Sequence, residues 1–539
     1  MKNIGSMNRR EFLYRTGAAA AALSHPRLLL QQKEVYARRQ FDASTLARFV
    51  DPLPIPPVLK PTDFRPSPPY SERKVPFYRL AMRPAETKLH RDLKPTRFWG
   101  FNGLFPGPTI EARAGQPVLV EWTNNLPASH MFPLDHNLEG AAAGKPEVRA
   151  VVHLHGARVP PESDGYPEHW FVPGQSSACF YPNNQESATL WYHDHAMGIN
   201  RLNIYAGLFG MFLIRDSFED GLNLPSGKYE IPLVLSDRQL DMEGQFLYPV
   251  SPDPERPWVP EVFGDAMLVN GKISPYCDVE PRPYRFRLLN GANGRFFHLA
   301  FENHEEFQQI GSDQGLLGAP VTMKLLTIGP GERADLIVDF SRHAGENLVL
   351  KSDQLSAVQF RVAGKSMPVA VPAIAAIPQT LRPVVRTPES DAIKTRELLI
   401  EETRDHAGNP TIMLLDRKRW MDPVSENPTL GSTEIWTIVN GTDDSHPIHL
   451  HLVRFQILDR RNFFVLRYLQ KRTLIYTGPP LPPDPNELGW KDTVRAESAM
   501  VTRIIVKFDG YPGRYVWHCH ILEHEDNEMM RPFEVIAPK

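Results

Sequence analysis

Ten of the 19 histidines in this chain lie in four short clusters. Each cluster contains a His-x-His pair, in or at the end of a strand-like run. On a strand, residues i and i+2 point to the same face, so each pair directs two imidazoles to one place. Neutral imidazole binds copper, zinc, iron or nickel. The clusters are His153 and His155; His193 and His195; His446, His449 and His451; and His518, His520 and His524.

Four such pairs in one chain indicate a metal site, although a single pair would mean little. Their eight imidazoles exceed what one ion can bind and suffice for about three ions. Two pairs come early in the chain and two come late. We therefore expect a metal cluster between the first and last domains.

One of only three cysteines, Cys519, stands between His518 and His520. Because neighbouring residues on a strand face opposite ways, its thiol must serve a separate ion. An electron accepted at that ion would need to travel only through the Cys519 backbone to reach the two flanking histidines. The protein would then supply position and electrostatics, and the metals the chemistry.

The residues around Cys519 complete a second ligand set. His524 and Met529 follow at intervals of five, and His446 stands apart from its neighbouring pair. Two histidines, a cysteine and a weak axial methionine are the ligands of a blue-copper electron-transfer site. Met529 fits the spacing better than Met530.

Two other uses of this cysteine are less consistent with the sequence. A structural zinc site is disfavoured because only one thiolate is present and no Cys-x2-Cys occurs. A cysteine nucleophile with a histidine base is possible in principle. It would leave nine clustered histidines unexplained.

Five stretches resemble the multicopper oxidases, the laccase superfamily, and within it the bacterial spore-coat laccase and bilirubin oxidase branch. The resemblance runs from about residue 60 to the C-terminus, and every ligand position of the family is filled. The stretches are "VVHLHGARVPPESDGYPEHWF", "LWYHDHAMGINRLNIYAGLFGMFLI", "STEIWTIVNGTDDSHPIHLHLVRFQILDRR", "GWKDTV" and "GRYVWHCHILEHEDNEMMRPF".

This resemblance implies four copper ions and the coupling of one-electron oxidations to reduction of O₂ to water. It also implies three cupredoxin domains, with a three-copper cluster between the first and third. The implied ligands are His153 and His449 for type 2 copper; His155, His193, His195, His451, His518 and His520 for the type 3 pair; and His446, Cys519, His524 and Met529 for type 1 copper.

Two carboxylates match acidic positions that assist protonation in the relatives. Asp164 lies in "ESDGYPEHW" and Glu525 follows His524. Reducing O₂ to water consumes protons, so a relay must reach the cluster. Both could instead be solvated loop acids or hydrogen-bond partners of a ligand histidine. Trp490, Lys491 and Asp492, in "GWKDT", match a family stretch near the clusters but could be only a packing element.

The elements that must position these residues are strands. The chain has 52 prolines and 35 glycines, and apolar runs bounded by turn residues recur along it. This pattern predicts an all-β fold of sandwiches or Greek-key barrels. A weak repeat links residues 100–125, 268–293 and 430–443, and each copy contains a strand that ends at Asn before a turn.

We predict cupredoxin domains at 41–220, 221–390 and 391–539. The segment 368–390 has the proline density of a linker. Segment 476–489 is also proline-rich, but we expect it to be a surface loop of the last domain. Residues 1–40 resemble a twin-arginine export signal, with Arg9 and Arg10 before "TGAAAAALS" and a plausible cut after Ala37. A basic, disordered tail is the alternative.

The composition limits the kinds of binding partner and cross-link that we expect. A net charge of −3 does not suggest a nucleic-acid or anionic-membrane binder. The apolar run near the N-terminus is too short to span a membrane. Three cysteines do not form a disulfide scaffold. Cys179 and Cys277 could pair or both be free. We expect a monomer.

The leading functional hypothesis is an exported oxidase of laccase type acting on phenols, aromatic amines or a tetrapyrrole such as bilirubin. A phenoxazinone synthase remains a substrate alternative. A cuprous oxidase would resemble relatives with a methionine-rich insert, whereas the 15 methionines here are scattered. A non-catalytic cupredoxin scaffold is the alternative of a different class, and the complete ligand set argues against it.

Overall fold

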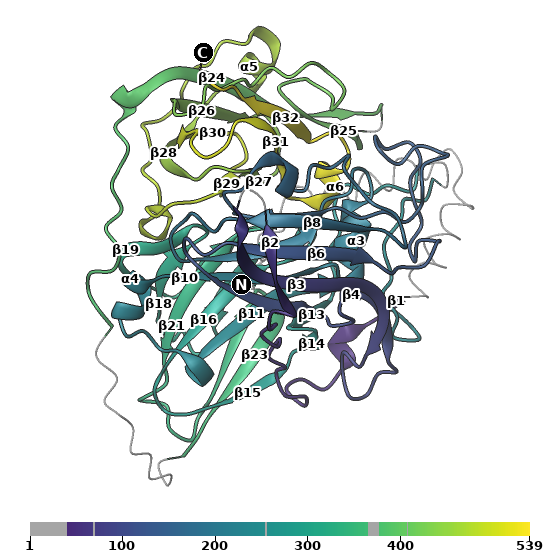
Figure 1. Cartoon of the computed structure of the whole chain (residues 1–539), viewed down its shortest axis with the longest axis vertical. Coiled ribbons are helices and arrows are strands. Elements are labelled where there is room, and N and C mark those ends of the chain that lie inside the picture. The colour runs from purple at the N-terminus through teal and green to yellow at the C-terminus, as the bar shows by residue number, and fades with distance from the viewer. Residues whose placement is uncertain (1–39, 68–69, 254–255, 365–376, 407, 539) are drawn as a thin grey trace, which may run out of the picture.

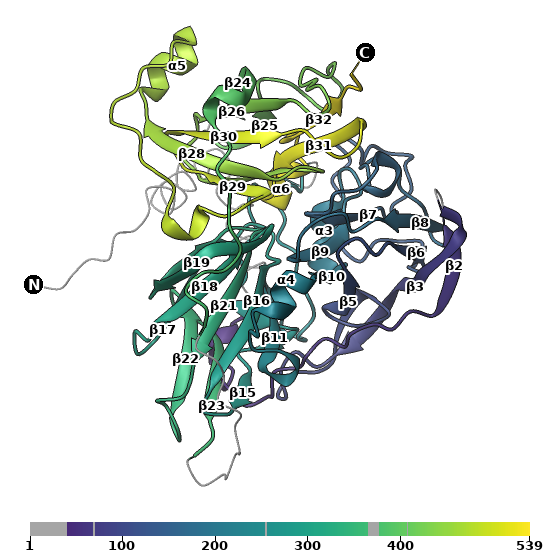
Figure 2. The same ribbon diagram turned by 60° about the vertical axis from the view of Figure 1, so that its left-hand side comes forward.

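The computed structural model describes residues 40–67, 70–253, 256–364, 377–406 and 408–538. The chain forms three β-rich units in sequence order, with the third lying across the first two (Figures 1 and 2). The proposed export signal, its cut and residues 368–376 of the proposed linker lie outside the described residues.

The first unit contains two sheets, one ordered β2-β3-β6-β8 with β4 beside β3, and one ordered β5-β10-β9-β7. Its strands are β2 (Asp63–Ser67), β3 (Tyr70–Thr87), β4 (Thr96–Phe101), β5 (Gly107–Arg113), β6 (Val118–Asn124), β7 (Val152–His155), β8 (Ser176–Tyr181), β9 (Ala188–Asp194) and β10 (Phe209–Arg215). Its helices are η1 (Ala43–Thr45), η2 (Pro161–Ser163), α3 (Asn200–Ala206) and α4 (Ser217–Gly221).

The second unit contains sheets ordered β14-β13-β11-β16-β21-β18-β19 and β15-β23-β22-β17-β20. Its elements are η3 (Gly227–Tyr229), β11 (Glu230–Arg238), β13 (Ala266–Val269), β14 (Lys272–Ile273), β15 (Tyr276–Val279), β16 (Pro283–Asn290), β17 (Phe297–Phe301), β18 (Phe307–Ser312), β19 (Gly315–Met323), β20 (Leu326–Ile328), β21 (Arg333–Asp339), β22 (Asn347–Ser352) and β23 (Leu355–Val362). A short ribbon pairs β1 (Gln40–Phe41) with β12 (Leu240–Asp241).

The third unit contains sheets ordered β25-β24-β26-β30-β28 and β29-β27-β31-β32. Its elements are η4 (Glu389–Asp391), β24 (Ala392–Arg404), β25 (Pro410–Leu415), β26 (Thr433–Asn440), β27 (His446–Leu450), β28 (Phe455–Asn462), α5 (Val465–Lys471), η5 (Pro485–Glu487), β29 (Thr493–Ala496), β30 (Met500–Lys507), β31 (Gly513–Cys519), α6 (Leu522–Glu525) and β32 (Met530–Val535). The predicted all-β class is confirmed.

The repeat seen in the sequence has a structural counterpart in all three units. Each unit contains an equivalent parallel strand pair, β3 with β6, β11 with β16 and β24 with β26. The later strand of each pair ends at an asparagine, at Asn124, Asn290 or Asn440. The Oδ1 atom of each accepts from the backbone N–H two residues on, at 3.1, 3.0 and 2.9 Å. This Asx turn ends the strand with its backbone polar groups satisfied.

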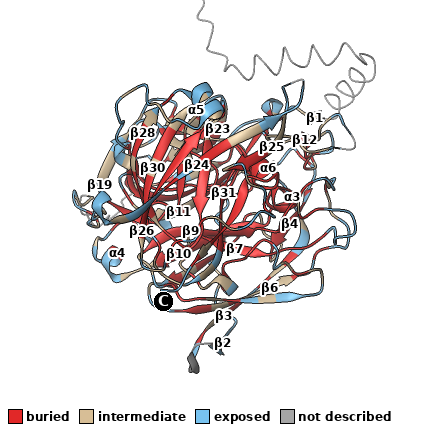
Figure 3. Ribbon diagram, turned by 90° about the horizontal axis from the view of Figure 1, so that it is seen from above, coloured by how far each residue is buried: buried red, intermediate tan, exposed pale blue. Residues whose placement is uncertain are grey.

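Burial follows the strand patterns. In β6 buried residues alternate with partly buried ones, so one face packs on the core and the other is partly covered. In β9 and β26 every residue is buried, because both faces of these strands are covered. Figure 3 shows such buried strands throughout the interior. The predicted domain boundaries near residues 220 and 390 remain predictions.

The cysteines are not paired. Cys179 is buried in β8, Cys277 is partly buried in β15, and all three thiols are free. Every helix in the described part of the chain is too short or too polar to traverse a lipid bilayer.

A buried cluster of charges joins the first and second units. The Oε1 atom of Glu219, in α4, accepts from Arg285 at 2.8 Å and from Arg287 at 2.5 Å. The remaining members of the cluster are Arg215, Glu230 and Asp335. Burial opposes ionisation of Glu219, but the two arginines hold the pKa of its carboxyl well below the ordinary 4.5. The carboxylate is therefore ionised in the folded protein at neutral pH.

We predict that Glu219→Gln destabilises the protein at pH 7 by roughly 3–5 kcal/mol, because it removes one charge from a buried ion-pair cluster. The folded pKa is depressed, so the contribution is full above the unfolded pKa and declines as pH falls below about 4.5. Thermal and denaturant unfolding of both proteins at pH 7 and pH 3 measure this difference. Asp220→Asn is the control, because Asp220 forms an exposed pair with Arg113 worth at most about 1 kcal/mol. Equal stability of the two variants at pH 7 would contradict the prediction.

Candidate metal centres

Two neighbouring strands of the third unit divide their candidate ligands between opposite faces of one sheet. β27 and β31 are antiparallel, with Ile448 opposite Cys519 and His449 opposite His518. Side chains of opposed residues lie on the same face. Cys519 therefore shares a face with Ile448 and, two residues earlier on β27, with His446. The pair of His449 and His518 points to the other face.

On the first face, His446, Cys519 and His524 form a buried three-ligand group. The Sγ atom of Cys519 lies 3.5 Å from Nδ1 of His446 and 3.9 Å from Nδ1 of His524. The two Nδ1 atoms are 3.2 Å apart. α6 places His524 by turning the chain directly after β31.

Met529, directly before β32, and Met530, its first residue, also lie on opposite sides of the sheet. Met529 is fully buried in the hydrophobic cluster that contains Cys519, and its carbonyl accepts from the Cys519 N–H at 3.0 Å. Met530 is opposite His518 and packs in a different cluster with Val516. The side chain of Met529 is thus on the Cys519 side of the sheet.

On the other face, the four His-x-His pairs meet between the first and third units. β7 and β9 bring His153 opposite His193. His153 stacks on His451 with ring centroids 3.7 Å apart, and His155 stacks on His449 at 3.6 Å. The four pairs that are far apart in the sequence therefore form one cluster.

Three Nε2 atoms converge within this cluster. Those of His195 and His451 each lie 3.3 Å from Nε2 of His518. His520 completes the other side, with its ring centroid 5.1 Å from that of His155 and 5.4 Å from that of His193.

His153, His193 and His449 are each anchored through one ring nitrogen and present the other to the cluster. Nδ1 donates to the carbonyl of Asp164 from His153 at 2.6 Å, to that of Asp194 from His193 at 2.8 Å, and to that of Asp492 from His449 at 2.8 Å. Within the described residues, the opposite nitrogens have no hydrogen-bond partner; these are Nε2 of His153, His193 and His449, Nδ1 of His155, and both nitrogens of His520. Buried nitrogens without a partner are costly unless a ligand binds them. They fit a metal cluster.

The electrostatics favour the metal-binding forms. Burial first, and then neighbouring rings, lower the pKa of His153, His155, His193, His449 and His451 well below 6.5. Burial also lowers the pKa of His195 to about 4 and that of His520 to about 3. These rings are neutral at pH 7, as metal ligands must be. Burial raises the pKa of the Cys519 thiol, so a metal must displace its proton on binding.

Both predicted carboxylates contact the cluster. Glu525 is fully buried, 3.4 Å from Nδ1 of His195 and 3.1 Å from Nδ1 of His518. Burial opposes its ionisation, but these two rings hold the pKa of Glu525 at about 2. Asp164 accepts from Nδ1 of His451 at 2.7 Å, and burial raises the pKa of its carboxyl well above 3.8. Neither residue is a solvated loop acid.

The "GWKDT" stretch is more than a packing element. Trp490 lies against the Arg454 guanidinium at 4.3 Å, and Lys491 pairs with Asp313 at 2.9 Å. Asp492 accepts from Nε2 of His155 at 3.1 Å. No role for Asp492 followed from the sequence. The buried segment 331–333 ("GER"), whose last residue Arg333 begins β21 and pairs with Asp492, was not identified from the sequence.

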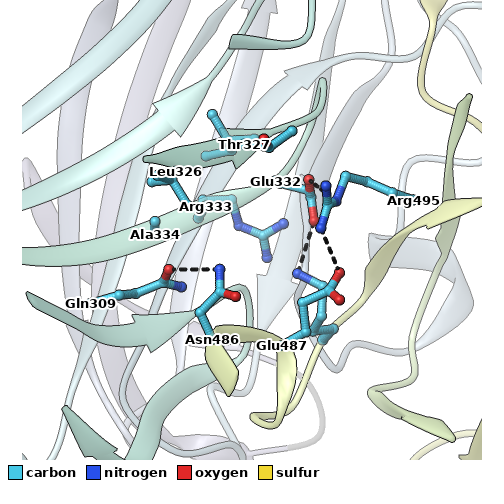
Figure 4. Close-up of a pocket in the computed structure, with 11 residues that line it drawn as sticks. Gln309, Leu326, Thr327, Glu332, Arg333, Ala334, Asn486, Glu487 and Arg495 are labelled. Carbon is cyan, nitrogen blue, oxygen red and sulfur yellow. Dashed lines mark hydrogen bonds and ion pairs between the residues drawn. The ribbon is translucent and has the colours of Figure 1, made fainter. Parts of the chain in front are cut away.

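Beside this network lies a polar pocket between the second and third units (Figure 4). Arg333 lines it together with Glu332 and Asn486, and Asn486 donates to Gln309 at 3.1 Å. The sequence signal for this region is an arginine at the start of the strand-like run "RADLIVD".

Comparison with known proteins agrees with this geometry. Family profiles described as multicopper oxidase match residues 398–539, and residues 85–135 and 146–219. A laccase of Bacillus subtilis is 45% identical over 521 residues, covering 92% of this chain and 99% of the relative. The chain belongs to the multicopper oxidases. A laccase of Haloferax volcanii is 40% identical, covering 92% of this chain and 86% of that protein. The crystal structure of a laccase from Pediococcus acidilactici superimposes with a TM-score of 0.72 at 28% identity, covering 91% of this chain and 95% of that one.

The protein is therefore a copper-dependent oxidase that uses O₂ and a reductant. Its donor sets suit this metal, because imidazole and thiolate ligands bind copper more strongly than most other divalent ions of the first transition row. The predicted family, the cupredoxin-like all-β fold and the oxidase activity are confirmed.

We predict that Cys519→Ser abolishes the blue colour and substrate oxidation while the fold persists, because a hydroxyl replaces the buried thiol with little change of shape. Visible absorption, copper content and thermal unfolding measure the three properties. Cys179→Ser, at a buried cysteine of the first unit, is the control and should remain blue. A Cys519→Ser protein with normal colour and turnover would remove this thiol from the metal site.

Proposed function

We propose that this multicopper oxidase is a laccase-type enzyme holding four copper ions in two sites. His446, Cys519, His524 and Met529 bind the type 1 copper. His153 and His449 bind type 2 copper, and the type 3 pair is bound by His155, His193 and His520 and by His195, His451 and His518. The observation that carries the proposal is Cys519 on one face of β31 with His518 on the other, while His520, directly after the strand, also lies in the histidine cluster.

When bound, copper supplies one-electron oxidation at the first site and four-electron reduction of O₂ to water at the second. The chain supplies the connection, because the backbone of one residue joins Cys519 to either flanking histidine. His446 and His524 are fully buried. A reductant therefore donates its electron across the protein surface without binding either ring.

This arrangement favours broad specificity for reductants. The only requirement is an electron that can cross to the buried site, so shape recognition contributes little. We propose phenols and aromatic amines as substrates, with bilirubin as a further candidate. The curated relatives described as laccases support this substrate class. We also propose export by the twin-arginine-like segment and a monomeric state.

Glu525 is proposed to carry protons to the cluster. Its carboxylate accepts from the Asn200 amide at 2.6 Å and contacts the outer nitrogens of two histidines. An ionised carboxylate in that position can accept a proton and pass it on. Asp164, protonated more readily because of its burial, holds a proton beside His451 and His153.

A substrate panel tests the proposed function. Copper-loaded protein would be given a methoxyphenol, an aminophenol, bilirubin or Cu(I), with O₂ uptake recorded. Uptake with the phenol supports the laccase assignment. Uptake with Cu(I) alone would instead assign a cuprous oxidase, and no uptake with any reductant would contradict the function.

We predict that Glu525→Gln slows O₂ reduction roughly 10–100-fold while changing type 1 reduction less, because it keeps the side-chain shape but cannot exchange a proton. Stopped-flow mixing of oxidised enzyme with reductant, and of reduced enzyme with O₂, separates the two steps. Glu426→Gln, at a buried carboxylate that accepts from Ser425, serves as the control. If type 1 reduction slows more than O₂ reduction, Glu525 is not on the proton path.

A further inference from the structure

The second unit supplies none of the twelve proposed copper ligands, yet one of its side chains reaches the edge of the trinuclear site. Arg333, the first residue of β21, has a side chain with no exposed surface. Resting on the function proposed above, we propose that Arg333 is a positioning residue for the trinuclear copper site. It acts by fixing Asp492, and through Asp492 the rings of His155 and His449.

The guanidinium of Arg333 joins all three units. Nε donates to the carbonyl of Thr189 in β9 of the first unit at 2.9 Å. Nη1 and Nη2 donate to the carbonyls of Gly331 and Asp313 in the second unit at 2.8 and 3.1 Å. The same two nitrogens hold both carboxylate oxygens of Asp492 in the third unit. The five N–H groups of the side chain thus have five acceptors, and none is left for water.

Asp492 in turn holds two ligand rings, one from the first unit and one from the third. Its Oδ1 accepts from Nε2 of His155 at 3.1 Å, and its carbonyl accepts from Nδ1 of His449 at 2.8 Å. These two rings stack at 3.6 Å. Because the carboxylate requires a proton on Nε2 of His155, the bare nitrogen of that ring is Nδ1, the one that faces the cluster.

The backbone around the pair leaves no space for a shifted guanidinium. Gly156 has φ +86°, and a Cβ there would lie 2.7 Å from Nη2 of Arg333 and 2.8 Å from Oδ2 of Asp492. Gly331 has φ +81°, and a Cβ there would lie 2.6 Å from the His520 ring. Close backbone approach from two units therefore holds the Arg333–Asp492 pair against the cluster.

A lysine cannot replace this arrangement. Its ammonium is a single point donor, whereas the planar guanidinium donates to both oxygens of Asp492 and to three carbonyls at once. In an Arg333→Lys protein, the Asp492 carboxylate loses the guanidinium and keeps the donors of Gln314 and Thr493, so it directs the proton on His155 to Nε2 less firmly. The type 1 site, on the opposite face of the β27–β31 sheet, is not contacted by Arg333.

The test compares Arg333→Lys with the wild type and with Arg396→Lys, all loaded with copper. Arg396 is the matched control, because it is a buried arginine in a two-oxygen pair with Glu434, at 2.5 and 2.9 Å, away from the histidine rings. Copper per chain, a chelator titration, the type 2 electron paramagnetic resonance spectrum, the blue band and thermal unfolding are measured on each protein.

For Arg333→Lys we expect the blue band to persist, the type 2 spectrum to change, and trinuclear copper to be lost at roughly 10–100-fold lower chelator concentration. Arg396→Lys should lose stability without either copper effect. If Arg333→Lys does not fold, Asp492→Asn tests the proposal in its place, because it keeps the side-chain shape. It should show the same changed type 2 spectrum and the same easier loss of trinuclear copper.

The proposal is overturned if the folded variant keeps the wild-type type 2 spectrum and chelator sensitivity, whatever its thermal stability. It is also overturned if Arg396→Lys shows the same copper losses. Failure of the function itself is seen separately, as a wild-type protein that binds no copper at the cluster or does not consume O₂.

Discussion

The alternation of side chains along β31 is the constraint on which the rest of the structure depends. This strand presents the Cys519 thiol to one face and the His518 imidazole to the other, and His520 directly after it adds a second imidazole to the histidine cluster. The separation between the two groups of ligands is therefore fixed by backbone geometry. β27 repeats the division with His446 and His449, and the pairing of Ile448 with Cys519 keeps both strands in register. A slip of one residue would send every ligand to the wrong face. β31 lies between two other strands of its sheet, β27 and β32, and pairing with both strands holds this register.

The histidine cluster between the first and third units adds a second constraint, because no single unit can form it. Its rings come from β7, β9 and the residue directly after β9 in the first unit, and from β27, β31 and the residues directly after each of them in the third. Rings of the two units stack on each other. Several buried nitrogens have hydrogen-bond partners only on their outer side within the described residues. Copper binding therefore stabilises the docked arrangement of units as well as the site itself. The second unit contributes through buried charges, at Arg285 and Arg287, which pair with Glu219 of the first unit, and at Arg333, which contacts both other units.

The sequence predicted what depends on local periodicity. His-x-His pairs and the thiol between His518 and His520 follow from the two-residue repeat of a strand, and the turn asparagines revealed three related units. The contacts that orient the rings could not be predicted from this local periodicity. Asp492 meets His155 across 337 residues, and Arg333 meets Asp492 across 159. Nothing in a local pattern shows which carboxylate will face which imidazole when separate units dock. That Cys179 and Cys277 are unpaired could likewise be seen only in the three-dimensional structure.

The groups that contact the outer nitrogens of the rings divide the cluster into two chemically different halves. His153, His193 and His449 donate to backbone carbonyls, which cannot change charge. The outer nitrogens of His195, His451 and His518 instead face the carboxyls of Glu525 and Asp164. Burial and neighbouring rings push the pKa values of these two carboxyls in opposite directions. The proposed proton uptake would therefore have both carboxyls on the half where three Nε2 atoms converge, while backbone carbonyls fix the tautomer of His153, His193 and His449. A site that must bind metal rigidly and still receive protons gains both properties from this division.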